Sequence, residues 1–116
     1  MRAVRAFAVL ALGAAALTGC ALFRSDAARG RHVADAWCSE CHRVAPDQPS
    51  GTRPGHTLPP PVAAPSFMDI AARPATTAAS LEHFLADLHL PMPTYRLSAE
   101  ERHQVIAYIL SLKAAH

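Results

Sequence analysis

Two thiols and an imidazole lie within five consecutive residues, Cys38-Ser39-Glu40-Cys41-His42. The two cysteines are three positions apart, a spacing that puts both thiols on one side of a helical turn. Each thiol can then add to one vinyl group of a haem, and the imidazole that follows can bind the iron. The pattern C-x-x-C-H is typical of c-type haem attachment. The sequence therefore predicts one covalent haem c on Cys38 and Cys41, with His42 as an iron ligand.

Three other uses of the same thiols are open. A redox dithiol of the C-x-x-C type is expected in a βαβ context, and the residues around Trp37 and Val44 have no strand pattern. A structural zinc site needs four ligands, and the sequence holds neither a second C-x-x-C pair nor an H-x-x-x-H pair. A simple disulfide would leave the adjacent His42 without a role.

Met92 is the candidate for the opposite side of the iron. It lies between Pro91 and Pro93, and a thioether on a proline-stiffened loop has little conformational freedom to lose on binding. A methionine opposite His42 raises the reduction potential and fills the position that oxygen or a substrate would need. A role as a gap filler in the core is the alternative for Met92. Other residues that could in principle bind the iron are Met68, His56, His83 and His89.

The first twenty residues carry an export pattern. Two arginines lie within residues 1–5, and an almost unbroken apolar run follows from Ala6 to Leu17. This arrangement is typical of a secretory signal, and the run is too short to span a bilayer comfortably. It ends in Leu17-Thr18-Gly19-Cys20, which resembles the lipobox of bacterial lipoproteins, in which the cysteine becomes the first residue and carries a diacylglycerol. Ordinary signal cleavage nearby, which would leave Cys20 as a free thiol, is the alternative.

These features divide the chain into three parts. Residues 1–19 are expected to be a lipoprotein signal peptide, residues 20–25 a short tether, and residues 26–116 the folded domain. Acyl chains on Cys20 would anchor the protein to the periplasmic face of a bacterial membrane. Export also implies an oxidising compartment, in which Cys38 and Cys41 need a chemical role.

Composition limits the partners and the core. Removal of residues 1–19 takes away two of the eleven basic residues and none of the nine acidic ones, so the net charge falls from +2 to zero. A neutral domain without a basic cluster is not expected to bind nucleic acid. Aromatic residues make up only 6% of the 116 residues. A domain this small usually needs a covalent cross-link or a cofactor to stabilise its core.

The elements that must position these side chains are predicted to be helices, because no segment alternates with period two long enough to form a strand. One helix is expected over Asp26–Cys41, and a short helical turn over Phe67–Ala72 that begins at Ser66. Seven of the ten prolines lie between Pro46 and Pro65, so that stretch is expected to be an extended surface loop at the haem edge. The predicted fold class is all-α.

Two further helices complete the prediction. Thr77 is the expected N-cap of the third helix, whose apolar face is made by Leu81, Phe84, Leu85 and Leu88. The last helix begins with the capping box Ser98-Ala99-Glu100-Glu101. Its apolar face is made by Val105, Tyr108, Ile109 and Leu112.

The chain resembles a bacterial class I cytochrome c in three stretches, namely Gly30–His42, Ala64–Phe67 and His89–Leu112. The resemblance rests on these stretches in this order and extends over nearly all of the mature chain, residues 20–116. The resemblance implies a small fold of three main helices and a short helical turn, wrapped around a single haem. It also implies that Met92 is the methionine that such proteins present just before the C-terminal helix.

The resemblance assigns packing roles at the first helix. A glycine inside a helix costs about 1 kcal/mol relative to alanine, and the resemblance gives Gly30 a reason, which is that the C-terminal helix crosses closely there. Tyr108 is the expected partner across the crossing. The family often has an aromatic residue one turn before the first cysteine, where this chain has Ala34, so Trp37 is expected to pack in its place.

The resemblance also implies contacts around the cofactor. In this family a proline carbonyl accepts the second N–H of the iron-bound histidine. Pro65 is the candidate here, with Pro60 and Pro61 as alternatives in the same proline-rich stretch. Arg53 and Tyr95 could meet the haem propionates or lie in solvent.

Both axial sites filled by His42 and Met92 would favour electron transfer over catalysis. We expect a periplasmic, membrane-tethered carrier of single electrons that docks on redox partner proteins with little electrostatic steering, and no catalytic residue of its own. Two other classes are open. One is a haem subunit of a larger dehydrogenase or oxidase complex. The other is a ligand-binding haem sensor or enzyme, should Met92 not bind the iron.

Overall fold

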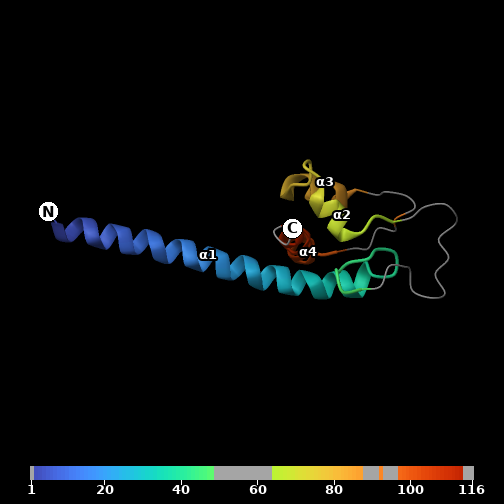
Figure 1. Ribbon diagram of the computed structural model, residues 1–116, viewed down its shortest axis with the longest axis horizontal. Coiled ribbons are helices and arrows are strands. Elements are labelled where there is room, and N and C mark those ends of the chain that lie inside the picture. Colours follow the sequence, from blue (N-terminus) through green and yellow to red (C-terminus); the bar gives the residue numbers. More distant parts are fainter. Residues whose placement is uncertain (1, 49–63, 88–91, 93–96, 114–116) are drawn as a thin grey trace.

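The computed structural model describes residues 2–48, 64–87, 92 and 97–113, with the backbone alone for residues 2–18 and Cys20. Its helices, labelled in Figure 1, are α1 (Arg2–Trp37), α2 (Phe67–Ala72), α3 (Ala78–Ala86) and α4 (Ala99–Leu112). The described residues include no strand. The all-α fold class and the count of three main helices with one short helical turn are thus confirmed.

Helix α1 is much longer than the other three, and the 70 Å longest dimension of the molecule lies along it (Figure 1). It runs without a break through residues 2–25 into the helix predicted to begin at Asp26. None of the helices in the described part of the chain has both the length and the apolar character of a membrane span.

The C-terminal end of α1 differs from the prediction, because the helix stops at Trp37 and not at Cys41. The N–H groups of Cys38 and Ser39 both donate to the carbonyl of Ala34, at 2.9 and 3.1 Å. The N–H of Cys41 then donates to Cys38 three residues back, at 3.2 Å. The bond of Cys38 spans four residues as in an α-helix, whereas those of Ser39 and Cys41 span five and three, so the helical pattern ends and the two cysteines lie in a turn that follows the helix.

The N-termini of the three shorter helices are capped as predicted. The Ser66 hydroxyl accepts the N–H of Asp69 at 3.0 Å, which begins α2. Thr77 caps α3, in a capping box completed by Ser80. Ser98 and Glu101 form the predicted capping box of α4, with hydrogen bonds of 3.2 and 2.8 Å between backbone and side chain. Each cap satisfies N–H groups that a helix leaves unpaired.

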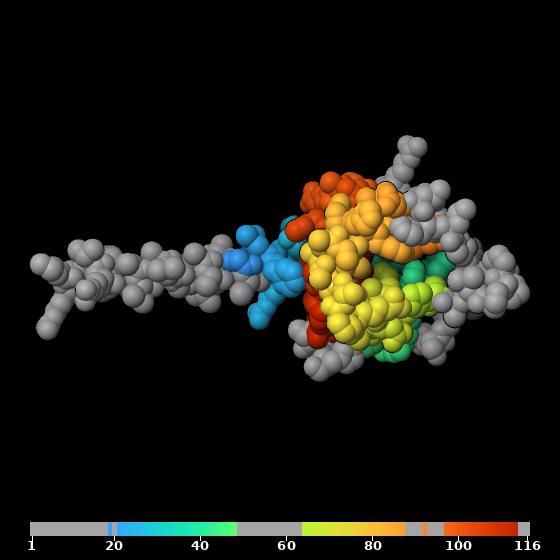
Figure 2. Space-filling model, turned by 90° about the horizontal axis from the view of Figure 1, so that it is seen from above, coloured from blue at the N-terminus to red at the C-terminus, as the bar shows by residue number. Residues whose placement is uncertain are grey.

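Helix α4 is the central element, because it packs against each of the other three helices. Figure 2 shows residues of α2 and α3, in yellow and orange, lying over the red C-terminal helix. The predicted apolar face of α4 is buried as expected, with no member more than 8% exposed. The buried cluster consists of Ala34, Val44, Phe67, Ala71, Leu81, Val105, Ile106, Tyr108, Ile109 and Leu112.

The crossing of α1 and α4 has the geometry that the resemblance implied. A methyl group on Gly30 would collide with the backbone carbonyl of Gln104 and would lie 2.9 Å from Cβ of Tyr108. Ala34, one turn further along α1, is completely buried. The two helices therefore approach so closely that only small side chains fit on this face of α1.

Two predicted packing positions differ from the structure. Phe84, expected on the buried face of the third helix, is 44% exposed, whereas Leu81 of the same helix is buried. Trp37, expected to pack in place of a family aromatic, is 47% exposed. Leu88 lies outside the described residues.

Candidate functional site

Cys38 and Cys41 lie in the turn that follows α1, and both thiols are free and half-buried. Cys38 packs against the buried cluster. Burial raises the pKa of the Cys38 thiol to about 11, and the neighbouring Cys41 adds to the shift. The N–H groups of Cys41 and His42 both donate to the carbonyl of Cys38, at 3.2 and 2.9 Å, so the whole motif is one compact turn.

The His42 imidazole is oriented by the backbone of a segment 23 residues further along the chain. Its Nδ1 lies 2.7 Å from the carbonyl oxygen of Pro65. The carbonyl can only accept, so Nδ1 carries the proton and donates. This tautomer leaves the lone pair on Nε2 for a metal. Of the three prolines considered from the sequence, Pro60 and Pro61 lie outside the described residues.

Pro65 is held in place by the start of α2. The N–H of Phe67 donates to the carbonyl of Arg43 at 2.9 Å, which joins the residue after His42 to the second residue after Pro65. The Phe67 ring is 5% exposed and lies 5.6 Å from the His42 ring and 6.4 Å from the Tyr108 ring, centroid to centroid. Packing and hydrogen bonds thus fix the imidazole from two directions.

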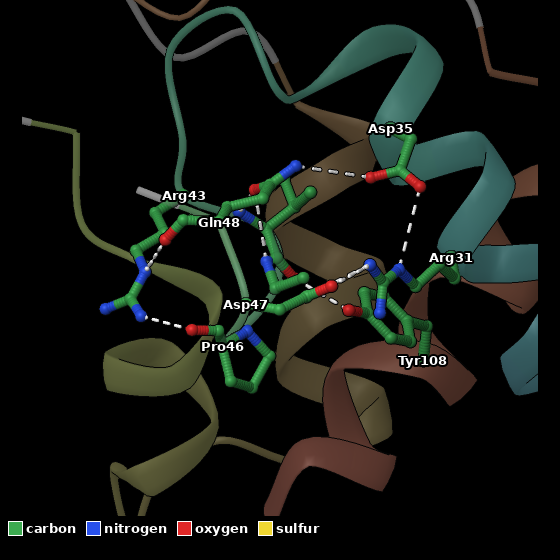
Figure 3. A network of polar contacts seen from close by, with 9 residues as sticks. Arg31, Asp35, Arg43, Pro46, Asp47, Gln48 and Tyr108 are labelled. Atoms are coloured by element: carbon green, nitrogen blue, oxygen red, sulfur yellow. Dashed lines mark hydrogen bonds and ion pairs between the residues drawn. The ribbon is translucent and has the colours of Figure 1, made fainter. Parts of the chain in front are cut away.

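The residues after His42 are fastened to the last helix. The Tyr108 hydroxyl donates to the carbonyl of Val44 at 2.8 Å in the buried interior. Arg31 of α1 lies beside Tyr108, and it forms one ion pair of 3.2 Å with Asp47 and one of 3.6 Å with Asp35 (Figure 3). Helix α4 thus supports the segment that follows the C-x-x-C-H motif.

The remaining predicted site residues are placed only in part. Met92 is half-buried in a bend, and its neighbours in sequence lie outside the described residues. Cys20 lies within α1, at a position where the structure describes the backbone alone. Met68 of α2 is half-buried against the core, and His83 of α3 lies exposed, 3.7 Å from Asp87. Arg53, His56, His89 and Tyr95 lie outside the described residues.

The donor set fits covalent haem c. Two free thiols in one turn can form thioethers, and the adjacent imidazole has the tautomer that leaves Nε2 for iron. Half-buried apolar side chains also pack against the core; they are Val33, Met68, Ile70, Leu85, Leu97 and Leu110. In the described part of the chain no three His, Cys, Asp or Glu side chains gather to hold a metal ion.

Sequence reasoning missed the polar side chains that organise residues 43–48. Gln48 accepts two backbone N–H groups, and the Arg43 side chain donates to the carbonyls of Pro46 and Gln48. Neither residue has a periodic pattern or a motif. A polar residue soon after C-x-x-C-H, in a stretch that cannot be helical, was the one available signal.

Comparison with known proteins agrees with this geometry. Residues 25–109 match the family described as cytochrome C oxidase, cbb3-type, subunit III. A curated relative, cytochrome c-552 of Bradyrhizobium diazoefficiens, is 36% identical over 89 residues, which are 77% of this chain and 77% of the relative. No solved structure matches. By the extent of the family match and the identity to this relative, the chain belongs to the cytochrome c family.

Proposed function

We propose that this chain is a mono-haem, class I electron carrier that passes single electrons between redox partner proteins. Membership of the cytochrome c family indicates haem-based electron transfer. The observation that carries the proposal is the 2.7 Å hydrogen bond between His42 Nδ1 and Pro65, beside two free thiols. It is the arrangement expected of an iron ligand whose tautomer and basicity are set by its partner.

Each residue of the site has a separate task. Cys38 and Cys41 would form the two thioethers, His42 would offer Nε2 to the iron, and Met92 would offer its thioether sulfur. When bound, the haem supplies one-electron exchange at its iron. A methionine in the second axial position raises the reduction potential and excludes small ligands. Pro65 fixes the imidazole ring, so little rearrangement is needed at the histidine between the two oxidation states.

The proposed cellular location rests on the first twenty residues. We propose that residues 1–19 are removed, that Cys20 carries lipid, and that residues 26–116 form the cytochrome c domain at the periplasmic face of a membrane. The support is the apolar run followed by Leu17-Thr18-Gly19-Cys20. Residues 20–25 would then hold the domain close to the bilayer that carries its partners.

A second candidate function is a haem subunit of a terminal oxidase complex. It is favoured by the family match, because that family is described as subunit III of cbb3-type cytochrome c oxidase. The electron-transfer chemistry would be the same. Affinity purification from membranes separates the two candidates, since a subunit would be recovered with oxidase polypeptides in fixed ratio and a free carrier would not.

The test of haem attachment uses the full-length chain produced in a bacterium that attaches haem c. Haem should remain on the polypeptide after acid-acetone extraction. Cys38→Ser and Cys41→Ser should each lose one thioether, while the third cysteine supplies a matched control in Cys20→Ser, which should keep both. A wild-type chain that releases its haem would contradict the proposal.

The test of the sixth ligand is the visible spectrum of the purified protein before and after carbon monoxide is added. We expect a low-spin spectrum with a methionine–iron charge-transfer band that carbon monoxide does not change. Met92→Leu should lose the band and bind carbon monoxide, whereas Met68→Leu is the matched control and should behave as wild type. An open site in the wild-type chain would favour a ligand-binding sensor or enzyme instead.

A further inference from the structure

One glutamine, Gln48, accepts the hydrogen bonds that hold the segment after the C-x-x-C-H motif. The N–H groups of Val44 and Ala45 donate to Oε1 of Gln48, at 2.8 and 3.2 Å. The Arg43 Nε donates to the backbone carbonyl of Gln48 at 2.9 Å. Figure 3 shows Gln48 between these groups and α1, with its amide nitrogen 3.5 Å from Asp35.

Burial makes these bonds necessary. Val44 and Ala45 are both 0% exposed, so their N–H groups depend on an acceptor that the protein supplies. A buried N–H without a partner destabilises the conformation that buries it. The side-chain oxygen of Gln48 serves both groups at once, and its removal would leave two buried donors unpaired.

The same segment supports the imidazole of His42. Two hydrogen bonds join the motif to the start of α2, one from His42 Nδ1 to Pro65 at 2.7 Å and one from the Phe67 N–H to Arg43 at 2.9 Å. His42 and Arg43 are adjacent in the sequence, and their partners Pro65 and Phe67 are separated by Ser66 alone. A shift of the backbone at Arg43 therefore changes both bonds together.

We propose that Gln48 is a positioning residue for the His42 imidazole, and that it acts by fixing residues 43–45 so that the ring keeps its hydrogen bond to Pro65. The inference rests on the proposed function, in which His42 is an iron ligand. Gln48 acts through the backbone, because its hydrogen bonds hold residues 43–45 and so keep the ring nitrogen of His42 within hydrogen-bond distance of the Pro65 carbonyl.

The consequence is measurable in the electron-transfer chemistry. An imidazole that donates a strong hydrogen bond is a more basic ligand, and a more basic ligand favours the ferric state. When the bond from His42 lengthens, the ligand becomes less basic and the reduction potential rises. Loss of Gln48 should therefore raise the potential, and it should also move the ring N–H proton resonance of His42 upfield in the ferrous protein.

The test compares four forms of the haem-loaded protein. Gln48→Ala removes the acceptor oxygen. The double variant Asp35→Asn/Gln48→Glu keeps the net charge, an acceptor at position 48 and a donor at position 35. Ile109→Val lowers stability through the core and alters none of the hydrogen bonds of residues 42–48. The reduction potential and the His42 ring N–H resonance are measured on all of them.

We expect Gln48→Ala to raise the potential and shift the ring resonance upfield, the double variant to restore both toward wild type, and Ile109→Val to change neither. If Gln48→Ala does not accumulate, Gln48→Asn shortens the amide by one methylene and should shift both readouts in the same direction. A loaded Gln48 variant with wild-type values overturns the positioning role alone. A wild-type chain without attached haem overturns the proposed function and this inference with it.

Discussion

Gly30 of α1 lies directly against the backbone carbonyl of Gln104 in α4, with no space between them for a methyl group. This contact sets how closely the first and last helices approach. The haem-attachment motif follows the end of α1, and Tyr108, one turn after Gln104, holds the segment beyond the motif. The helix crossing and the functional site are thus parts of one structure.

Gly30→Ala is expected to destabilise the protein even though alanine is the better helix former. Forcing a methyl group against backbone costs roughly 1–3 kcal/mol, which exceeds the gain in helix propensity of about 1 kcal/mol. Urea unfolding of the haem-loaded protein measures the difference. Ala28→Gly, at an exposed position of the same helix, measures the propensity term by itself. A Gly30→Ala protein more stable than wild type would contradict the close crossing.

Tyr108→Phe should lower the free energy of unfolding by about 1–2 kcal/mol, because the buried carbonyl of Val44 loses its donor while the ring stays in place. Tyr108→Leu should cost more, since the ring also packs against Phe67. Denaturant titration of the two variants separates the hydroxyl from the ring. Equal stability of Tyr108→Phe and wild type would mean that the hydrogen bond contributes nothing net.

The capping box of α4 should make stability depend on pH in the acid range. Hydrogen bonds from the backbone N–H and the hydroxyl of Ser98 hold the pKa of Glu101 below its ordinary value of 4.5. A lowered pKa in the folded state stabilises the protein above pH 4.5, and this stabilisation is lost as the pH falls through the folded-state pKa.

Thermal unfolding of wild type and Glu101→Gln between pH 3 and pH 7 checks this. The wild-type advantage should be full near neutrality and shrink below about pH 4.5, as the carboxylate takes up its proton. Glu100→Gln removes the same charge from the same helical turn without the bonds to Ser98 and is the control. A constant difference across the whole range would show that the ionised cap is not the cause.

Cys38 should react slowly with alkylating reagents in the folded chain before haem is attached. With its pKa raised to about 11 from 9.0, chiefly by burial, the thiolate is about one hundredfold rarer at pH 8 than in an exposed thiol. In the variant Cys20→Ser/Cys41→Ser, made without haem, alkylation by iodoacetamide should speed up by at least about tenfold in urea. Equal rates in buffer and urea would contradict the burial of this thiol.

Local rules in the sequence predicted much of this structure. Ser66, Thr77 and Ser98 cap their helices because a cap depends on residues three positions apart, which a sequence displays directly. The close crossing at Gly30 was implied by resemblance, not by pattern. The end of α1 at Trp37 was missed, because no motif in the sequence shows that the N–H of Ser39 donates to the carbonyl of Ala34, five residues back, in place of the helical partner four residues back.

The contacts of residues 43–48 could not be predicted for a different reason. Gln48 binds backbone groups, and any polar residue of suitable length could do so in some loop conformation. The conformation itself is decided by burial of Val44 and by its bond to Tyr108, 64 residues away. Such choices depend on which distant segments meet, and short sequence patterns do not encode that. The predicted burial of Phe84 was wrong for the same reason, because the exposure of a side chain depends on which segments outside its own helix pack against it.

Because α4 packs against each of the other three helices, the core of the described residues cannot form before this helix docks. Five of the ten residues of the buried cluster belong to α4, and the hydrogen bond between Tyr108 and Val44 joins residues 64 positions apart. Closing such long loops carries an entropic cost that is recovered only when both ends have docked. Before α4 docks, α1, α2 and α3 therefore have no shared core, and the segment after Cys38 and Cys41 lacks the Tyr108 hydrogen bond to Val44.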